Sequence, residues 1–181
     1  MEDVTESHPG ETAGIVNPLG MGRFRSLYET HARGAVALAL LLTRDRALAE
    51  DIAQEAFIRV ARRFGDLRDP AAFPAYLRKA VVNLARSHAR RVRLERERLE
   101  LIVAGDRGGA DPSGERGDLW QALSLLPFRQ RTALVLRFGE DLPEREVAKI
   151  LDTSEKAVRS LVGRGKEALR KELGGRGTWT L

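Results

Sequence analysis

The sequence predicts an all-α protein of two small helical domains joined by a flexible linker. Valine and isoleucine recur at helical spacings and do not alternate, so no segment shows the two-residue period of a strand. Between Leu142 and Arg170, small and apolar residues have the spacing of two short helices that cross over a tight turn. From Ala104 to Gly117 the chain holds five glycines, one proline and no apolar residue larger than alanine, so this stretch cannot form a core.

These features divide the 181 residues into five segments. We expect a disordered acidic leader (1–18), a first helical domain (19–101), a linker (102–117), a second helical domain (118–173) and a frayed tail (174–181).

The folded part of the chain is basic and lacks cysteine. The net charge is +5, and residues 1–18 hold four acids and no Lys or Arg, so residues 19–181 carry +9. Such a charge favours a polyanionic partner, with nucleic acid ahead of a membrane surface. Without cysteine, disulfides and thiolate metal sites are excluded. No secretory signal is evident, and the longest apolar run, Ala35 to Leu42, is eight residues, so we expect a cytoplasmic protein without membrane insertion.

Three helices are expected in the first domain. Residues 22–42 carry apolar side chains that suit a buried helix, and a second helix is expected over residues 46–64. Residues 65–70 contain Gly, Asp and Pro, which indicate a loop. A long third helix is expected from Ala71 to beyond Arg91. Pro74 lies in its first turn, where a missing amide hydrogen costs little.

The second domain is expected to end in a helix-turn-helix. An amphipathic segment begins near Asp118, and a second helix follows over residues 127–138. Next, the small side chain of Ala148 allows two helices to cross closely. Asp152 stands at the turn, where the backbone must enter the left-handed region, and Asp adopts that region more readily than most residues. Ser154 can cap the second helix of the motif.

The helix after Ser154 has an apolar face and a basic face. Its apolar and small residues recur at helical spacing and form one inward stripe. The opposite face carries Lys156, Arg159, Ser160 and Arg164, which in a major groove would reach phosphates and base edges. The alternative is a basic amphipathic helix whose polar face is only solvated.

The helix expected over residues 46–64 also uses two faces. One arc is apolar, whereas the other carries Asp51, Gln54, Glu55 and Ile58. An aliphatic side chain rimmed by acids and an amide is typical of a non-obligate protein-docking patch. The residues alone leave a second interpretation open, in which Asp51 and Glu55 form surface ion pairs with neighbouring arginines.

The next helix is basic. No acid occurs between Arg78 and Leu94, a stretch that contains six basic residues together with Asn83. Phe73 and Tyr76 lie at its start. Aromatic rings, an amide and a row of cations are what a site for single-stranded nucleic acid requires. The alternative is that the aromatic residues belong to an ordinary core stripe.

Four motifs in order resemble the sigma-70 family of transcription initiation factors, in its two-domain, extracytoplasmic-function (ECF) type. DIAQEAF (51–57) is similar to the core-polymerase-binding motif of region 2, of the form D-x-x-Q-E-x-F. YLRKAVVNLARSHARR (76–91) resembles the promoter-melting helix, and LPFRQRTALVLRF (126–138) with the helix-turn-helix resembles region 4. The resemblance covers residues 22–172, with the linker between the two regions.

The resemblance implies a non-enzymatic factor without cofactor or metal. Such a factor binds promoter DNA and core RNA polymerase. Its contacts with polymerase lie at the clamp region of the beta-prime subunit and at the beta flap. An anti-sigma factor is a common further partner in the family. The implied polymerase contacts are Asp51, Gln54, Glu55 and Ile58. The implied contacts to the downstream (minus-ten) element are Arg68, Phe73, Lys79, Asn83, Arg86 and Arg90; those to the upstream (minus-thirty-five) element are Ser154, Lys156, Arg159, Ser160 and Arg164.

The chain departs from the family pattern in places. Tyr76 replaces a usual Trp, Ser87 a usual Asp, and Asp152 stands where Gly is frequent. Gly163 and Gly165 each lower helix propensity by about 1 kcal/mol relative to Ala. These differences bear on which promoters are bound more than on the function.

The residues are also compatible with two other functions. The first is a self-sufficient helix-turn-helix DNA-binding regulator whose first domain senses a signal or dimerises. The second is a metal-dependent nuclease that uses Asp51 and Glu55, which lie one turn apart on a helix. Two carboxylates without further clustered ligands make a poor metal site, so the nuclease is disfavoured.

Overall fold

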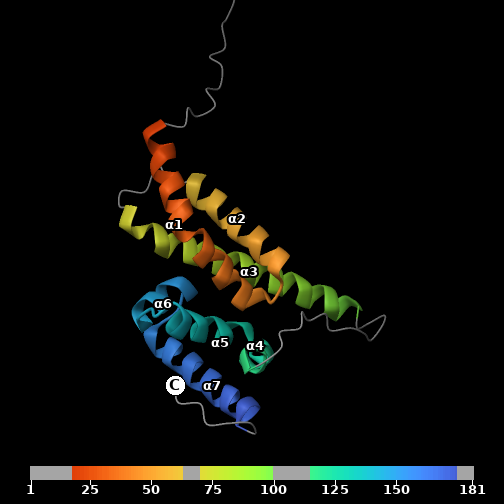
Figure 1. Cartoon of the computed structure of the whole chain (residues 1–181). Coiled ribbons are helices and arrows are strands. Elements are labelled where there is room, and N and C mark those ends of the chain that lie inside the picture. The colour runs from red at the N-terminus through yellow and green to blue at the C-terminus, as the bar shows by residue number, and fades with distance from the viewer. Residues whose placement is uncertain (1–17, 63–69, 100–114, 175–181) are drawn as a thin grey trace, which may run out of the picture.

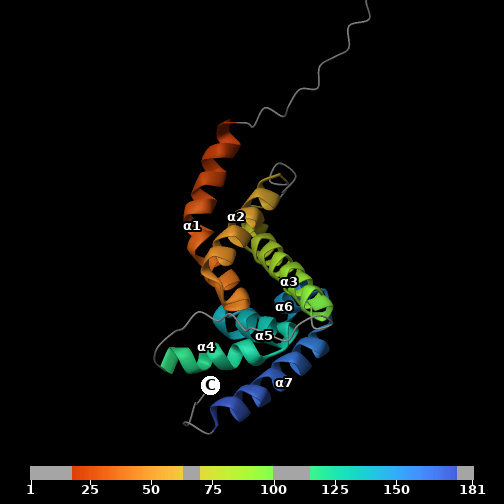
Figure 2. The ribbon, with the colours of Figure 1, turned by 90° about the vertical axis from the view of Figure 1, so that its right-hand side faces the viewer.

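The computed structural model describes residues 18–62, 70–99 and 115–174. Over these residues the chain is helical and contains no strand, which confirms the predicted fold class (Figures 1 and 2). Residues 1–17 of the predicted leader, Arg68, most of the predicted linker and residues 175–181 of the predicted tail lie outside the described residues. Within the described ranges, no helix combines the length and apolar character that crossing a bilayer requires.

The first domain consists of three long helices and one short 3-10 turn. They are α1 (Pro18–Thr43), α2 (Arg46–Arg62), η2 (Pro70–Ala72) and α3 (Phe73–Leu99). α1 begins earlier than expected, and α3 begins at Phe73 because Pro70 to Ala72 form the separate turn η2. Pro74 occupies the first turn of α3, as predicted.

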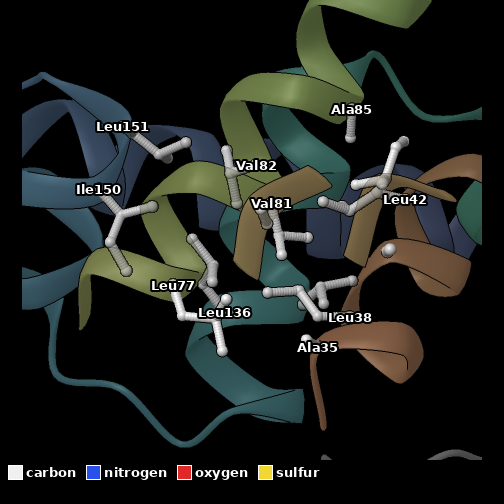
Figure 3. Packing of buried hydrophobic residues seen from close by; sticks show 14 of the residues in the cluster. Ala35, Leu38, Leu42, Leu77, Val81, Val82, Ala85, Leu136, Ile150 and Leu151 are labelled. Carbon is white, nitrogen blue, oxygen red and sulfur yellow. The ribbon is translucent and has the colours of Figure 1, made fainter. Parts of the chain in front are cut away.

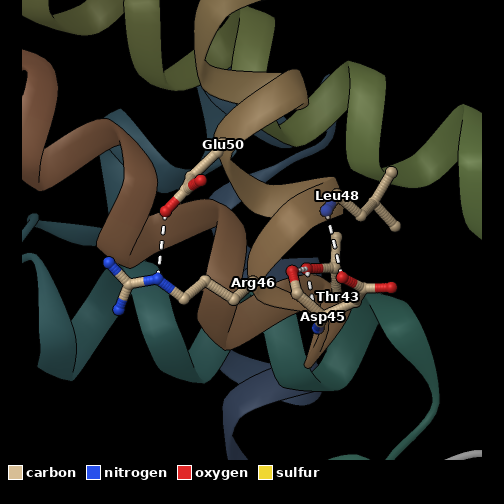
Figure 4. A network of polar contacts seen from close by, with 5 residues as sticks. All are labelled: Thr43, Asp45, Arg46, Leu48 and Glu50. Carbon is tan, nitrogen blue, oxygen red and sulfur yellow. Dashed lines mark hydrogen bonds and ion pairs between the residues drawn. The ribbon is translucent and has the colours of Figure 1, made fainter.

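The turn between α1 and α2 is fixed by side chains that bond to the backbone (Figure 4). Arg44 adopts a left-handed backbone with φ of 63°, which ends α1. The carboxylate of Asp45 accepts a hydrogen bond from the amide of Leu48 at 3.0 Å and so caps the start of α2. Thr43 Oγ1 donates to the carbonyl of Ala39 at 2.9 Å. The sharp reversal brings α2 back along α1.

Aromatic rings occupy the core of the first domain. Phe73 has no exposed surface. Its ring lies 6.3 Å from that of Phe24 and 6.0 Å from that of Phe57, measured between centroids. The imidazole of His31 lies 5.7 Å from the same ring. Phe73 therefore joins the start of α3 to both α1 and α2.

The second domain contains the predicted helix-turn-helix. Its elements are α4 (Glu115–Leu125), α5 (Phe128–Leu134), the π-helical segment η3 (Val135–Gly139), α6 (Glu144–Leu151) and α7 (Glu155–Leu173). The single helix expected over residues 127–138 is therefore divided into α5 and η3.

The turn between α6 and α7 has the predicted geometry. Asp152 lies in the left-handed region, with φ of 49° and ψ of 58°. Ser154 Oγ accepts a hydrogen bond from the amide of Ala157 at 3.2 Å and caps α7. Ala148 is buried where the two helices cross.

The two glycines of α7 have different surroundings. A Cβ atom at Gly165 would lie 2.8 Å from Leu134 Cδ1 and 3.1 Å from its Cγ, whereas a Cβ at Gly163 would meet nothing within 4 Å. Gly165 lets α7 approach α5 closely. Gly163 has no such packing requirement.

These surroundings predict opposite effects for the same substitution. Gly163→Ala is expected to raise the free energy of unfolding by about 0.5–1 kcal/mol, through helix propensity. Gly165→Ala is expected to lower it by about 1 kcal/mol, because the overpacking cost of about 1–3 kcal/mol exceeds the propensity gain. Urea unfolding followed by circular dichroism measures both values. Equal stabilisation by the two variants would contradict the close approach of α5 and α7.

The two domains share one continuous apolar core in this structure. Leu77 and Val81 of α3 lie between Leu38 of α1 and Ile150 of α6, and Leu136 of η3 completes the contact (Figure 3). All five residues are buried. α3 therefore packs against the second domain as well as against α1 and α2, and the helix-turn-helix is held beside it (Figure 2).

Candidate nucleic-acid and protein interfaces

The first candidate interface is the outward face of α2, which we call the docking face and define as Asp51, Gln54, Glu55 and Ile58. Asp51, Gln54 and Ile58 are exposed, and Glu55 is half-buried. Ile58 leaves 46% of its surface in solvent, although the apolar arc on the other side of the helix is buried. The structure therefore brings these four residues together on one accessible surface, as predicted from their spacing.

One of the two interpretations of this face concerned ion pairs. Glu55 forms a 2.7 Å ion pair with Arg59, in which both side chains are about half exposed. Asp51 forms no ion pair with another described residue. An exposed pair within one helix contributes only about 0.3–0.5 kcal/mol, so Glu55 can exchange Arg59 for a partner protein at little cost. The pair does not exclude a docking role.

The second candidate interface is a line of polar side chains on α3, which we call the basic stripe and define as Lys79, Asn83, Arg86 and Arg90. Their spacing of four, three and four residues places them along one face of the helix. Arg86 and Arg90 are exposed, and Asn83 Oδ1 accepts a hydrogen bond from Arg86 Nη2 at 2.9 Å. This stripe presents cations and one amide in a row, as a nucleic-acid strand would require.

The structure corrects the prediction for Phe73. We expected Phe73 to contact the downstream element, but its ring is completely buried among Phe24, Phe57 and His31. A buried ring cannot stack on a base. Phe73 is a core residue, and Arg68, predicted for the same site, lies outside the described residues.

The structure also adds a residue to the basic stripe. Tyr76 leaves 54% of its surface exposed and precedes Lys79 by three residues, which places it at the start of the same face. The sequence left Tyr76 between a core role and a stacking role. Its exposure favours stacking, since base–aromatic stacking needs an accessible ring.

The third candidate interface is the outward face of α7, which we call the reading face: Ser154, Lys156, Arg159, Ser160 and Arg164. All five residues are exposed. Arg159 Nη1 donates to Glu144 Oε2 at 2.8 Å, and Arg164 Nε donates to the carbonyl of Ser160 at 3.3 Å. The face points away from the apolar core, as a helix that enters a major groove requires.

Lys79 is already engaged in the structure. Its Nζ atom donates to Asp152 Oδ1 at 2.6 Å and to the carbonyl of Lys149 at 3.3 Å. The hydrogen bond from Lys79 holds the pKa of Asp152 below its usual value, helped by the charges of Lys79 and Arg86. The turn of the helix-turn-helix thus lies against the basic stripe.

Two arginines from different domains also act on each other. Arg131 of α5 is largely buried near Arg44, which ends α1, and burial together with the Arg44 charge lowers its pKa. The Nε atoms of both arginines are buried without a hydrogen-bond partner. Within the described ranges, no three His, Cys, Asp or Glu side chains gather where they could hold a metal ion.

Comparison with known proteins identifies the family. The model for sigma-70 region 2 matches residues 27–95, and the model for sigma-70 region 4 matches residues 116–169. The RNA polymerase sigma-H factor of Pseudomonas aeruginosa is 33% identical over 154 residues, which cover 76% of this chain and 79% of that protein. The chain belongs to the sigma-70 family. The region 2 match contains the docking face and the basic stripe, and the region 4 match contains the reading face.

Other relatives place this sigma factor in the ECF group. The ECF RNA polymerase sigma factor SigE of Mycolicibacterium smegmatis is 34% identical over 163 residues, covering 84% of this chain and 62% of that protein. The probable RNA polymerase sigma factor RfaY of Xanthomonas campestris pv. campestris is 38% identical over 151 residues, or 76% of this chain. This alignment spans only 37% of the length of RfaY.

Solved structures share the fold. The sigma factor RpoE of Bartonella quintana, crystallised with the anti-sigma factor NepR, superposes with a TM-score of 0.71 at 19% identity, over 85% of this chain and 98% of that one. CnrH, in complex with the cytosolic domain of CnrY, superposes with a TM-score of 0.63 at 22% identity, over 88% and 97%. Both therefore share the helical fold of this chain.

The family establishes the general function. The protein is a transcription initiation factor of ECF type, since both sigma-70 regions occur in order in one chain. Sigma factors bind core RNA polymerase and promoter DNA. The self-sufficient DNA-binding regulator is not favoured, because the first domain matches region 2 and not a sensor or dimerisation domain.

Proposed function

We propose that this sigma factor binds core RNA polymerase through the docking face of α2, at the clamp region of the beta-prime subunit, and through region 4 at the beta flap. The observation that carries this assignment is the exposure of Asp51, Gln54 and Ile58 together on the outward side of a helix whose other side is core. A small apolar contact surrounded by charge is suited to an interface that forms and dissociates during each initiation cycle.

The basic stripe then holds the downstream promoter element. Arg86, Arg90 and Lys79 contact the strand backbone, while Asn83 and Tyr76 contact a base extruded from the duplex. Unpairing and unstacking one base costs a few kcal/mol, which base capture and phosphate contacts offset. This work requires no covalent chemistry, so we propose a non-enzymatic factor that acts beside polymerase in the cytoplasm.

The reading face of α7 supplies the upstream contact. Lys156, Arg159 and Arg164 reach phosphates or guanine edges, and Ser160 reaches either purines or pyrimidines. Arg159 must leave Glu144, with which it forms an exposed ion pair. Because NepR binds RpoE, whose fold this chain shares, we also propose that an anti-sigma factor regulates it.

Reconstituted transcription tests the function. Core polymerase with this protein is expected to initiate at a promoter that core alone ignores, and the isolated protein is expected to bind the same duplex weakly. The reverse outcome, tight and specific duplex binding without polymerase and no initiation with it, would establish the self-sufficient regulator.

The reading face gives a specific prediction. Arg164→Ala is expected to reduce initiation about 10- to 100-fold at a promoter with an upstream element, since a good base contact contributes about 1–3 kcal/mol. Arg170→Ala is the matched control: Arg170 is also exposed on α7, but it lies in the last turn of the helix, six residues beyond Arg164. Run-off transcription measures both variants. Equal losses would show that the charge of α7 matters and the position of Arg164 does not.

A further inference from the structure

Two arginines that are far apart in the chain come together without a counter-ion. Arg44 follows the end of α1, Arg131 lies in α5, and the end of α1 lies against α5 (Figure 2). The charge of Arg44 acts on Arg131, and the Nε atom of each guanidinium is buried without a hydrogen-bond partner. Neither arginine forms an ion pair with another described residue. Burying like charges in this way is unfavourable unless an anion offsets them.

The protein's own groups around this arginine pair do not neutralise it. Asp45 follows Arg44 directly, but its Oδ1 atom accepts the hydrogen bond from the amide of Leu48 at 3.0 Å (Figure 4). α5 contains no acid that could pair with Arg131. The C-terminal end of α1 contributes only about half a negative charge through the helix dipole, against two full cations. Within the described part of the chain, the pair therefore keeps an excess of positive charge.

Both arginines are held in position and remain within reach of solvent. The Arg131 Cζ atom lies 5.8 Å from the centroid of the Phe128 ring, one turn earlier in α5, at the distance of a cation–π contact. The left-handed backbone of Arg44, with φ of 63°, belongs to the turn that the Asp45 cap fixes. Each arginine is half-buried as a whole, so a small anion can approach its guanidinium group.

The chemistry of the pair favours a phosphate group as its ligand. A guanidinium group presents planar sets of N–H donors that match two oxygens of a phosphate or a carboxylate. A carboxylate carries a single negative charge, whereas a phosphate group carries about 1.5 to 2 near neutral pH. Two cations without a counter-ion are therefore balanced better by a phosphate group than by a carboxylate.

We propose that Arg44 and Arg131 form a binding site for one phosphate group between the end of α1 and α5. The site includes no residue of the docking face, the basic stripe or the reading face, so it does not rest on the function proposed for those surfaces. Because a ligand that binds the folded protein stabilises it, phosphate should also stabilise the free protein.

Isothermal titration calorimetry of the full-length protein with inorganic phosphate tests the site, in a chloride buffer of constant ionic strength. We expect one phosphate for each chain. Arg131→Gln and Arg44→Gln should each weaken binding at least about tenfold, because each removes charged hydrogen bonds to the ligand. Arg129→Gln is the matched control, since Arg129 is exposed on the same helix. Its affinity for phosphate should stay within about twofold of the wild type.

Thermal unfolding separates binding from folding. Arg131→Gln should remain folded, because it removes a buried charge that has no partner. Phosphate should raise the Tm of the wild type and of Arg129→Gln, but not that of Arg131→Gln or Arg44→Gln. Equal increases in the wild type and in all three variants would show a general salt effect and would overturn the site.

Adenosine monophosphate in the same titration distinguishes the source of the phosphate group. Tighter binding than that of inorganic phosphate, lost in Arg131→Gln, would identify an organic phosphate as the ligand. Weaker binding would identify the free anion. The absence of saturable binding of either compound would overturn the proposal, as would a site at Arg131 that takes only an oligonucleotide.

Discussion

Replacing Phe73 with alanine is expected to lower the free energy of unfolding by about 3–5 kcal/mol. The ring has no exposed surface and contacts Phe24 of α1 and Phe57 of α2, so its removal leaves a cavity where three helices meet. Since small domains are stable by only about 5–15 kcal/mol, much of this domain should unfold under mild conditions. Urea unfolding followed by circular dichroism measures the loss.

Tyr76→Ala is the matched control for this substitution. Tyr76 begins the basic stripe three residues after Phe73, but more than half of its surface is exposed, so its truncation should change stability by no more than about 0.5 kcal/mol. It should instead weaken binding of a single-stranded oligonucleotide, because stacking contributes about 1–3 kcal/mol for each base. If the Phe73→Ala protein were as stable as the wild type but bound DNA more weakly, Phe73 would belong to the nucleic-acid interface.

The contrast between these two aromatic residues shows which features the sequence could predict. The turn at Asp152 and the cap at Ser154 were predicted because backbone conformation and side-chain capping are set by residues within one helical turn. The helix faces followed from the 3.6-residue period. Phe73 and Tyr76, however, both stand at the start of one helix, and only packing against α1 and α2 decides which ring is buried.

Contacts between segments that are far apart in the sequence could not be predicted either. The sequence predicts Lys79 as a DNA-binding cation, whereas its contact with Asp152 joins residues 73 positions apart in the chain. Likewise, the glycines of α7 were both interpreted as a loss of helix propensity. The structure separates them, because Gly165 faces Leu134 and Gly163 faces open space.

Replacing Asp51, Gln54 and Glu55 together with alanine is expected to weaken binding to core RNA polymerase at least about 100-fold. A hydrogen bond contributes about 1 kcal/mol, so losing one contact at each of the three positions costs about 3 kcal/mol, and each factor of ten in affinity corresponds to about 1.4 kcal/mol. The three positions are adjacent on the docking face, so their truncation removes its whole polar rim. Biolayer interferometry with immobilised core polymerase measures the affinity, and run-off transcription should fall in parallel.

The control variant is Glu50→Ala, which removes one acid from the same helix. Glu50 pairs with Arg46 at 3.0 Å and does not belong to the docking face, so polymerase binding should stay within about twofold of the wild type. The triple variant should retain its helical content, because alanine favours helix at exposed positions. A triple variant that binds core polymerase normally would contradict the assignment of this face.

The rates of binding distinguish the roles within the docking face. Asp51 and Glu55 lie on the rim, where charge mainly accelerates encounter, so Asp51→Asn should lower the association rate and reduce its dependence on salt. Ile58 is the apolar centre, and contacts of this kind mainly prolong the bound state. Ile58→Ala should therefore raise the dissociation rate about tenfold with little change in association. If both variants changed only the association rate, Ile58 would lie outside the buried part of the interface.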